Sequence, residues 1–313
     1  VNTRTGRPDF AKNLFSPGGE RMPMSVGLSF WQYAESGNYS TGLPSGWKFG
    51  FQQYVYASGS DYHYIDGDYR LHVFRPLGDG RYYDSEHTGL VFDPSSGSMT
   101  DGRCLTMTFS DGRLTQISEK TAPDGSADTL TVSYAANSVT VTDAAGRSAT
   151  IAFGTNITVT RPDGGTYTLT VTGGRLTKIS EPGVGEHTYS YDSSGRLISA
   201  SAAGGDTVEF AYGADGKVQS VTEKLGSSAL KKYAFDYVPY ATHVDETKYP
   251  SGSSVTRSMA YTYADNGDAL GSYELSDDEF SAVRFRSSDD YKRYVMYVNR
   301  EESEKGGFSD YEG

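Results

Sequence analysis

The stretch HTYSYDSSGRLISA, residues 187–200, decides how the chain folds locally. Tyr189 and Tyr191 fall on one face of an extended segment, because successive side chains of a strand point to opposite faces. Residues 192–195 read Asp-Ser-Ser-Gly, in which Asp can accept bonds from the backbone ahead of it and Gly can adopt a positive φ. Residues 196–200 resume a strand-like pattern, so the stretch predicts a β-hairpin with a short turn.

The same signal recurs along the chain. A Gly followed by a basic and an aliphatic residue stands at Gly174, Gly195 and Gly216, each 21 residues after the last, and looser copies begin at Gly112 and Gly146. A period of this length holds two turns and two strands of about six or seven residues. One repeat is therefore one hairpin, and the sequence predicts an all-β fold of consecutive antiparallel hairpins.

Composition agrees with many short strands. The chain has 313 residues, of which 37 are Gly and 25 are Tyr, a composition typical of short strands and tight turns. This length allows one large β-domain or two ordinary ones. We predict a β lead-in region at 1–103, hairpin repeats at 104–226, and degenerate repeats with an acidic tail at 227–313.

Charge excludes some partners. The net charge of −12 argues against nucleic-acid binding, which needs clustered Lys and Arg, and disfavours docking on anionic membranes. No apolar run of about 18 residues occurs, so no membrane insertion is predicted. The chain opens at Val1 without a signal-like segment, and we expect a mature product or an excised part of a longer chain. The single cysteine, Cys104, permits no intrachain disulfide.

No motif predicts catalysis, a cofactor or a metal site. Phosphate-binding loops and the serine-hydrolase elbow are absent from the sequence. The acidic cluster at 277–279 is interpreted as a solvated turn in preference to a Ca²⁺ site. None of the histidines shows the spacing of a helical metal site, and each is expected on the surface or on a strand face: His63, His72, His87, His187 and His243.

Two pairs of tyrosines offer an alternative function. Aromatic rings can stack on sugars, and acidic neighbours can accept hydrogen bonds from sugar hydroxyls. Tyrosine is also a favoured strand residue that packs across strands, which is the preferred interpretation here. The candidate glycan-binding residues are Tyr54, Tyr56, Tyr62 and Tyr64.

The repeat resembles a known family. The YD-repeat, or Rhs, family has the motif Tyr-x-Tyr-Asp-x-x-Gly-Arg-Leu, and this chain matches every defined position with Tyr189, Tyr191, Asp192, Gly195, Arg196 and Leu197. Residues 1–6, 22–26 and 46–50 resemble, in the same order, the lead-in to Rhs cores. The resemblance covers about residues 1 to 225 and fades afterwards.

The resemblance implies a structural role. Its hairpins would build a coiled, spiral sheet that in larger members closes into a shell around a toxin or other cargo. It implies a non-enzymatic segment of such a shell, from a secreted or surface-displayed bacterial protein of the toxin encapsulation or delivery type. The partners would be the remainder of the polypeptide and its cargo, at the cell surface or outside the cell. The alternative is a glycan-binding surface adhesin, and a third, less favoured hypothesis is an acid-using hydrolase.

Overall fold

The structure is a computed structural model. It describes residues 1, 3–17, 22, 24–31, 42–85, 88–101, 105–119, 127–250, 254–263, 269–275 and 280–284. Every regular element in these residues is a β-strand. None of them forms a helix that could cross a membrane. The chain forms two compact units, residues 9–188 and residues 1–8 with 189–313, and each is described by itself.

The unit of residues 9–188 begins with a small antiparallel sheet. It is made of β1 (Asp9–Phe15), β2 (Val26–Trp31) and β3 (Trp47–Phe49), in that order. The Trp47 ring packs edge-on against Phe10, with 5.6 Å between ring centroids, and lies 5.0 Å from Phe30. Aromatic contacts of this kind add to the free energy of burial, and Trp47 is the centre of the aromatic cluster on this sheet.

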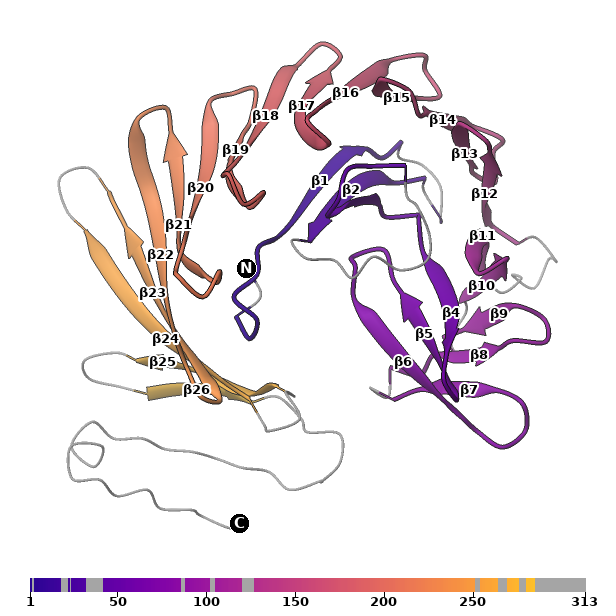
Figure 1. The fold of residues 1–313 in the computed structure, drawn as a ribbon, viewed down its shortest axis with the longest axis horizontal. Coiled ribbons are helices and arrows are strands. Elements are labelled where there is room, and N and C mark those ends of the chain that lie inside the picture. The colour runs from indigo at the N-terminus through magenta and orange to yellow at the C-terminus, as the bar shows by residue number, and fades with distance from the viewer. Residues whose placement is uncertain are drawn as a thin grey trace. The chain divides into compact units, whose positions relative to one another are not determined.

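The next eight strands form a closed ring. They are β4 (Tyr54–Ser58), β5 (Asp61–Ile65), β6 (Leu71–Pro76), β7 (Tyr82–Asp84), β8 (Val91–Asp93), β9 (Ser98–Thr100), β10 (Leu105–Ser110) and β11 (Arg113–Glu119). Each pairs antiparallel with the next. The ring closes because β11 returns to β4, where Arg113 pairs with Tyr54 (Figure 1). Leu114 N–H donates to the Gln53 carbonyl at 2.9 Å, and Val55 N–H donates to the Gly112 carbonyl at 2.8 Å.

Aromatic side chains fill the ring. The buried cluster consists of Val55, Tyr64, Phe74, Phe92, Met99, Phe109 and Leu114. The Phe109 ring meets Tyr64 and Phe92 edge-on at centroid distances of 5.8 and 6.3 Å. Since full burial of one such side chain stabilises the fold by about 1.5–3 kcal/mol, this cluster is a core of its own.

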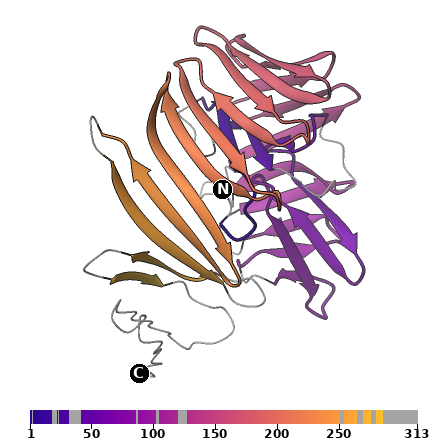
Figure 2. The same ribbon diagram turned by 60° about the vertical axis from the view of Figure 1, so that its left-hand side comes forward.

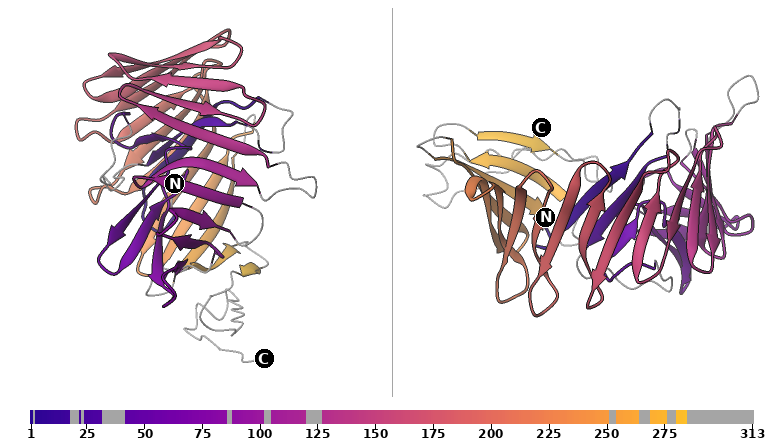
Figure 3. Two further views of the ribbon diagram at one scale, coloured as in Figure 1. Left: turned by 90° about the vertical axis from the view of Figure 1, so that its right-hand side faces the viewer. Right: turned by 90° about the horizontal axis from the view of Figure 1, so that it is seen from above.

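From β11 the chain continues as a row of antiparallel strands (Figure 3). The row in this unit consists of β12 (Thr129–Ala135), β13 (Ser138–Thr142), β14 (Ser148–Ala152), β15 (Asn156–Thr160), β16 (Thr166–Thr172), β17 (Arg175–Glu181) and β18 (Gly185–Tyr191). Apolar side chains on alternate positions are buried, as in Ala149 and Ile151 of β14. One face of the row is therefore apolar and the other meets water.

The first sheet lies against the apolar face of this row (Figure 1). The Tyr167 hydroxyl of β16 donates to the Leu14 carbonyl of β1, and the rings of Phe15 and Tyr167 stack at 6.2 Å. The Lys12 ammonium forms an ion pair with Glu181 at 3.1 Å. The lead-in strand β1 thus covers apolar surface that the row would otherwise expose.

The second unit continues the same strand order. It contains β19 (Leu197–Ser201), β20 (Asp206–Tyr212), β21 (Val218–Leu225), β22 (Ser228–Val238), β23 (Ala241–Lys248), β24 (Val255–Tyr263), β25 (Ala269–Leu275) and β26 (Phe280–Arg284), with the long strands side by side (Figure 2). The first residues of the chain lie on this sheet. Val218 N–H donates to the Gly6 carbonyl at 2.8 Å, and the Thr242 hydroxyl donates to the Thr3 carbonyl at 2.6 Å.

The all-β class and the consecutive antiparallel hairpins predicted from the sequence are confirmed. Gly195 has a φ of 86°, the left-handed conformation that its place in Asp-Ser-Ser-Gly requires. The division at residues 103 and 226 stays a prediction. The expectations for His87, Cys104, residues 277–279 and the acidic tail from residue 285 lie outside the described residues.

Candidate functional site

The turn of the central repeat is held by one aspartate. Asp192 Oδ1 accepts from the backbone N–H groups of Ser194 and Arg196, both at 2.9 Å, and Oδ2 accepts from Arg196 Nε at 2.6 Å. Partial burial acts to raise the pKa of Asp192, but the hydrogen bonds and charge of Arg196 outweigh it and lower the pKa. The motif needs Asp and Arg four residues apart because together they close this turn, and we call the pair the turn staple.

The staple also occurs in the loose copy of the repeat signal at Gly146. Asp143 Oδ1 accepts from the Arg147 N–H at 2.9 Å, and its Oδ2 accepts from Arg147 Nε at 2.7 Å. The Asp143 side chain is completely buried. The signal that could have found Asp143 is the same Asp-x-x-Gly-Arg spacing, ending at Gly146 and Arg147.

Basic residues after the turns contact tyrosines of the following strand. The Arg196 guanidinium lies over the Tyr212 ring at 4.6 Å, and the Tyr212 hydroxyl donates to the Leu197 carbonyl at 2.6 Å. In the next repeat Lys217 lies 4.8 Å from the centre of the Tyr237 ring, whose hydroxyl donates to a backbone carbonyl. We call this pair of contacts the tyrosine latch, and it joins one strand to the next.

The aliphatic residue of the Gly-basic-aliphatic signal fills the core. At this position Leu114, Leu176, Leu197 and Val218 are all fully buried. The signal therefore combines three physical tasks: a positive φ at Gly, a cation for a tyrosine ring, and an apolar side chain for the interior. Tyr189 of β18 is buried as well, and Tyr191 is partly buried.

The four candidate glycan-binding tyrosines lie mainly in packed surroundings. Tyr54 and Tyr64 are only 5% and 3% exposed, and Tyr64 belongs to the ring core. Tyr62 packs edge-on against Tyr82 at 4.7 Å. The Tyr56 hydroxyl is 3.3 Å from His63 Nδ1. The structure brings these residues together on β4 and β5, and glycan binding stays a prediction.

A buried charged network joins the ring to the first sheet. The Lys48 side chain of β3 is completely buried, and its ammonium donates to the carbonyls of Asp66 and, at 3.3 Å, of Gln52. It also lies 5.0 Å from the centre of the Tyr69 ring. Burial lowers the pKa of Lys48 to about 8, although the charges of Asp66 and Asp68 oppose this change.

His72 forms the second half of this network. Its Nδ1 lies 2.9 Å from Asp84 Oδ2 and its Nε2 lies 3.3 Å from Asp66 Oδ2. Burial acts to lower the pKa of His72, but the hydrogen bonds and charges of Asp66 and Asp84 outweigh it and raise the pKa to about 9. The Thr88 hydroxyl also donates to Asp84. His72 lies on a strand face, as expected, but it points inward and is 4% exposed.

This network has the chemistry of a structural ion pair. Burial acts to raise the pKa of Asp66, but the bonds from His72 and from backbone N–H groups outweigh it and lower the pKa. An ionised Asp66 cannot donate a proton near neutral pH, and a charged His72 cannot accept one. No group of three or more His, Cys, Asp or Glu that could hold a metal ion occurs in the described part of the chain. The sequence shows no sign of the network, because its members lie on different strands and turns and follow no recognisable spacing.

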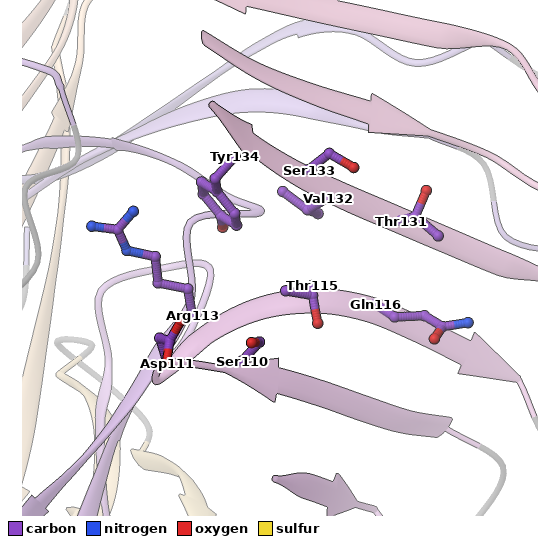
Figure 4. Close-up of a pocket in the computed structure, with 9 residues that line it drawn as sticks. All are labelled: Ser110, Asp111, Arg113, Thr115, Gln116, Thr131, Val132, Ser133 and Tyr134. Carbon is purple, nitrogen blue, oxygen red and sulfur yellow. The ribbon is translucent and has the colours of Figure 1, made fainter. Parts of the chain in front are cut away.

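The sheet divides at β11. Residues 112–114 bond to β4, whereas Gln116 to Ser118 pair with Thr129 to Thr131 of β12. Beyond Thr131, β12 therefore diverges from β11, and a cleft of about 760 Å³ opens between them (Figure 4). We call it the fork cleft. Arg113 lies over the Tyr134 ring at 5.5 Å at one end.

A comparison with protein families matches the repeat. The model of the family described as RHS Repeat matches residues 172–207 and 191–228. The match contains the staple at Asp192 and the latch between Arg196 and Tyr212, and it confirms the resemblance stated from the sequence. None of the curated proteins matches the chain.

Solved structures give weaker likenesses to this chain. A Tc holotoxin pore of Photorhabdus luminescens is 12% identical over 69% of this chain and 18% of its own, with a TM-score of 0.31. A TcdB2-TccC3-Cdc42 structure is 11% identical over 88% of this chain and 19% of its own, with a TM-score of 0.37. A porin-like protein of Bacteroides uniformis is 12% identical over 83% of this chain and 92% of its own, with a TM-score of 0.21. At these TM-scores the likenesses carry no argument, and this chain spans less than a fifth of the two toxin-related chains.

The tyrosine latch predicts a measurable contribution to stability. The Tyr237 hydroxyl donates to the Val218 carbonyl at 2.8 Å, and Tyr237→Phe removes this bond while keeping the ring over Lys217. We expect the free energy of unfolding to fall by about 1 kcal/mol, measured by urea denaturation. Tyr240→Phe is the control, because Tyr240 is 62% exposed. Equal stability of the two variants would contradict the latch.

The charged network predicts a pH dependence. Folding raises the pKa of His72 from 6.5 to about 9, so its stabilisation is fully present below pH 6.5 and is lost as the pH rises through 9. Folding lowers the pKa of Lys48 from 10.5 to about 8, so Lys48 makes the free energy of unfolding rise with pH, but only above pH 8. We expect the urea midpoint to fall between pH 6.5 and pH 8. His72→Gln should abolish this slope, and His243→Gln, at an exposed strand position, should keep it. If the urea midpoint of the unsubstituted chain stayed constant or rose between pH 6.5 and pH 8, the stabilising ion pair of His72 would be refuted.

Proposed function

We propose that the chain is a non-enzymatic segment of a shell built by RHS repeats, in a secreted or surface-displayed bacterial protein of the toxin encapsulation or delivery type. The observation that carries the proposal is that the repeat geometry extends beyond the matched residues. The staple recurs at Asp143 and Arg147, and the latch recurs at Lys217 and Tyr237. A single repeating contact pattern is suited to building one continuous wall.

The partners in this proposal are the rest of the same polypeptide and its cargo. The row of β12 to β18 has an apolar face that β1 covers in part, and the strands are joined by backbone pairing along their whole order. A continuous row leaves free edges only where it ends or divides, which lowers the risk of edge-to-edge aggregation. Such a wall is suited to enclosing another polypeptide outside the cell or at its surface.

The absence of catalysis is also part of the proposal. The buried ionisable side chains of the described residues are engaged in ion pairs and hydrogen bonds, as at Lys48, His72 and Asp84. A carboxyl group acts as a general acid near neutral pH only if its pKa is raised, and the pKa of Asp66 is lowered instead. The network therefore supports a structural role.

Turnover assays test the non-enzymatic part. The chain should not hydrolyse a panel of glycosides and peptides, and it should not be retained by an array of immobilised glycans. Hydrolysis that disappears in both Asp66→Asn and Asp84→Asn would overturn the scaffold proposal. Retention on a glycan that is lost in Tyr56→Ala or Tyr62→Ala, without turnover, would favour the surface adhesin instead.

Protease protection tests the shell. In the complete polypeptide that contains this chain, the cargo segment should resist trypsin at concentrations that digest the same cargo expressed alone. Opening the repeat wall with the double substitution Asp192→Ala and Asp143→Ala, which removes two turn staples, should make the cargo sensitive. A cargo that is digested equally fast in both contexts would contradict the shell.

A further inference from the structure

One edge of β12 has a strand partner only up to Thr131 in the part of the chain that the structure describes. On its other edge, β12 pairs with β13 from Thr131 to Ala135. Toward β11, its pairing stops at Thr131, because residues 112–114 of β11 are bonded to β4. Every second residue of 132–135 therefore directs its backbone N–H and C=O groups to the fork cleft, along about 13 Å of strand.

In the part of the chain that the structure describes, the open residues of this edge lack the usual protections of a charge, a proline or a bulge. Proteins normally guard exposed strand edges with charged side chains, proline, bulges or a covering segment. The open residues read Val132-Ser133-Tyr134-Ala135, without a charge or a proline. Val132 is buried, so its side chain holds the strand in place while the backbone edge stays open. An edge of this kind is a template for an added strand.

The opposite wall of the cleft is polar. It is formed by Ser110, Asp111, Thr115 and Gln116, whose hydroxyl, carboxylate and amide groups can bond to a second edge of an inserted chain (Figure 4). The volume of about 760 Å³ lies within the usual range for ligand sites. The cleft can therefore hold a short extended segment between two hydrogen-bonding walls.

Charge favours a basic segment. Asp111 is exposed and has no ion-pair partner among the described residues, and the whole chain has a net charge of −12. Attraction of this kind raises the rate at which a cationic ligand associates. Among the described residues that line the cleft, Arg113 alone is basic, and its guanidinium lies over the Tyr134 ring at 5.5 Å.

The cleft fits a sugar less well than a peptide. Sugar sites depend on an aromatic face that is open to the ligand, and the one aromatic residue here, Tyr134, has Arg113 over its ring. Burial raises the pKa of Tyr134 to about 12, although Arg113 opposes this change. The backbone edge is the more accessible feature, and it recognises a polypeptide.

We propose that the fork cleft binds an extended, basic peptide of a partner protein, which adds as a strand to residues 132–135 of β12. The peptide's backbone would pair with the open edge, and a Lys or Arg at its end would lie beside Asp111. This binding site is independent of the proposed function, because it needs only the fork and not a closed shell.

The first test uses alternating backbone methylation. The probe is a fluorescein-labelled hexapeptide of alternating threonine and valine that ends in two lysines, titrated with the complete chain at low salt and followed by anisotropy. In an added strand, alternate N–H groups face the partner. Methylation of the set that faces β12 should weaken binding about tenfold or more, and methylation of the other set, which faces only side chains of the opposite wall, should weaken it clearly less. No saturable binding, or equal weakening by both sets, would overturn the proposal.

The second test places a bulky side chain in the cleft. Ser133→Arg should abolish binding of the probe, whereas Thr150→Arg should leave it unchanged, because Thr150 is exposed on β14, whose two edges are both paired. Circular dichroism of both variants shows whether the sheet is intact. If Ser133→Arg keeps its circular dichroism spectrum and still binds like the unsubstituted chain, the cleft is not the site.

The third test concerns charge. Asp111 has a φ of 49°, a conformation that Asn also tolerates, so Asp111→Asn changes the charge with little strain. It should weaken binding of the lysine probe about two- to fivefold and leave a glutamine version of the probe unaffected. If Asp111→Asn weakened binding of both probes equally, Asp111 would not select a basic peptide, and this part of the proposal would be wrong. If soluble oligosaccharides such as chitotriose displaced the probe, the cleft would be a sugar site, and the peptide proposal would be overturned.

Discussion

The backbone pairing between β11 and β4 is the contact on which the rest of the first unit depends. Two hydrogen bonds, from Leu114 to Gln53 and from Val55 to Gly112, close eight strands into a ring around an aromatic core. Because β11 uses half of one edge for this closure, only its other half is left for β12. The start of the strand row, its direction away from the ring and the fork cleft all follow from this division of one edge.

The repeats propagate from that start through a small set of contacts. A carboxylate closes the turn, a glycine takes the left-handed conformation, a cation lies over a tyrosine, and an aliphatic side chain fills the core. Lys217 and Val218 replace the Arg and Leu of the motif and keep the latch, because a cation and an apolar group are all that the position needs. This tolerance explains how copies that differ in sequence can share one geometry.

The sequence predicted what is local. The hairpin at Asp192 to Gly195 and the 21-residue period depend on neighbouring residues, and both correspond to strands and turns of the structure. It could not predict the contacts between distant strands. Ring closure and the fork cleft arise where β4 and β11, which are remote in sequence, meet, and the network of Lys48, Asp66 and His72 joins different strands and turns. No spacing within one strand encodes such contacts. Asp143 is an intermediate case. Its spacing to Gly146 and Arg147 is present in the sequence and was enough to predict the turn staple, although the sequence analysis did not use it.

Hydrogen exchange of two backbone amides tests ring closure most directly. The N–H groups of Val55 and Leu114 bond across the β4–β11 junction, so in the native chain their exchange should be slowed to the level of the Phe109 amide, which lies in the same ring. Amide-resolved exchange measured by nuclear magnetic resonance distinguishes them from neighbouring loops. Protection of all three amides to a similar degree is the expected result. Rapid exchange at Val55 and Leu114 with a protected Phe109 would show that the ring is open, and would contradict this account of the fork.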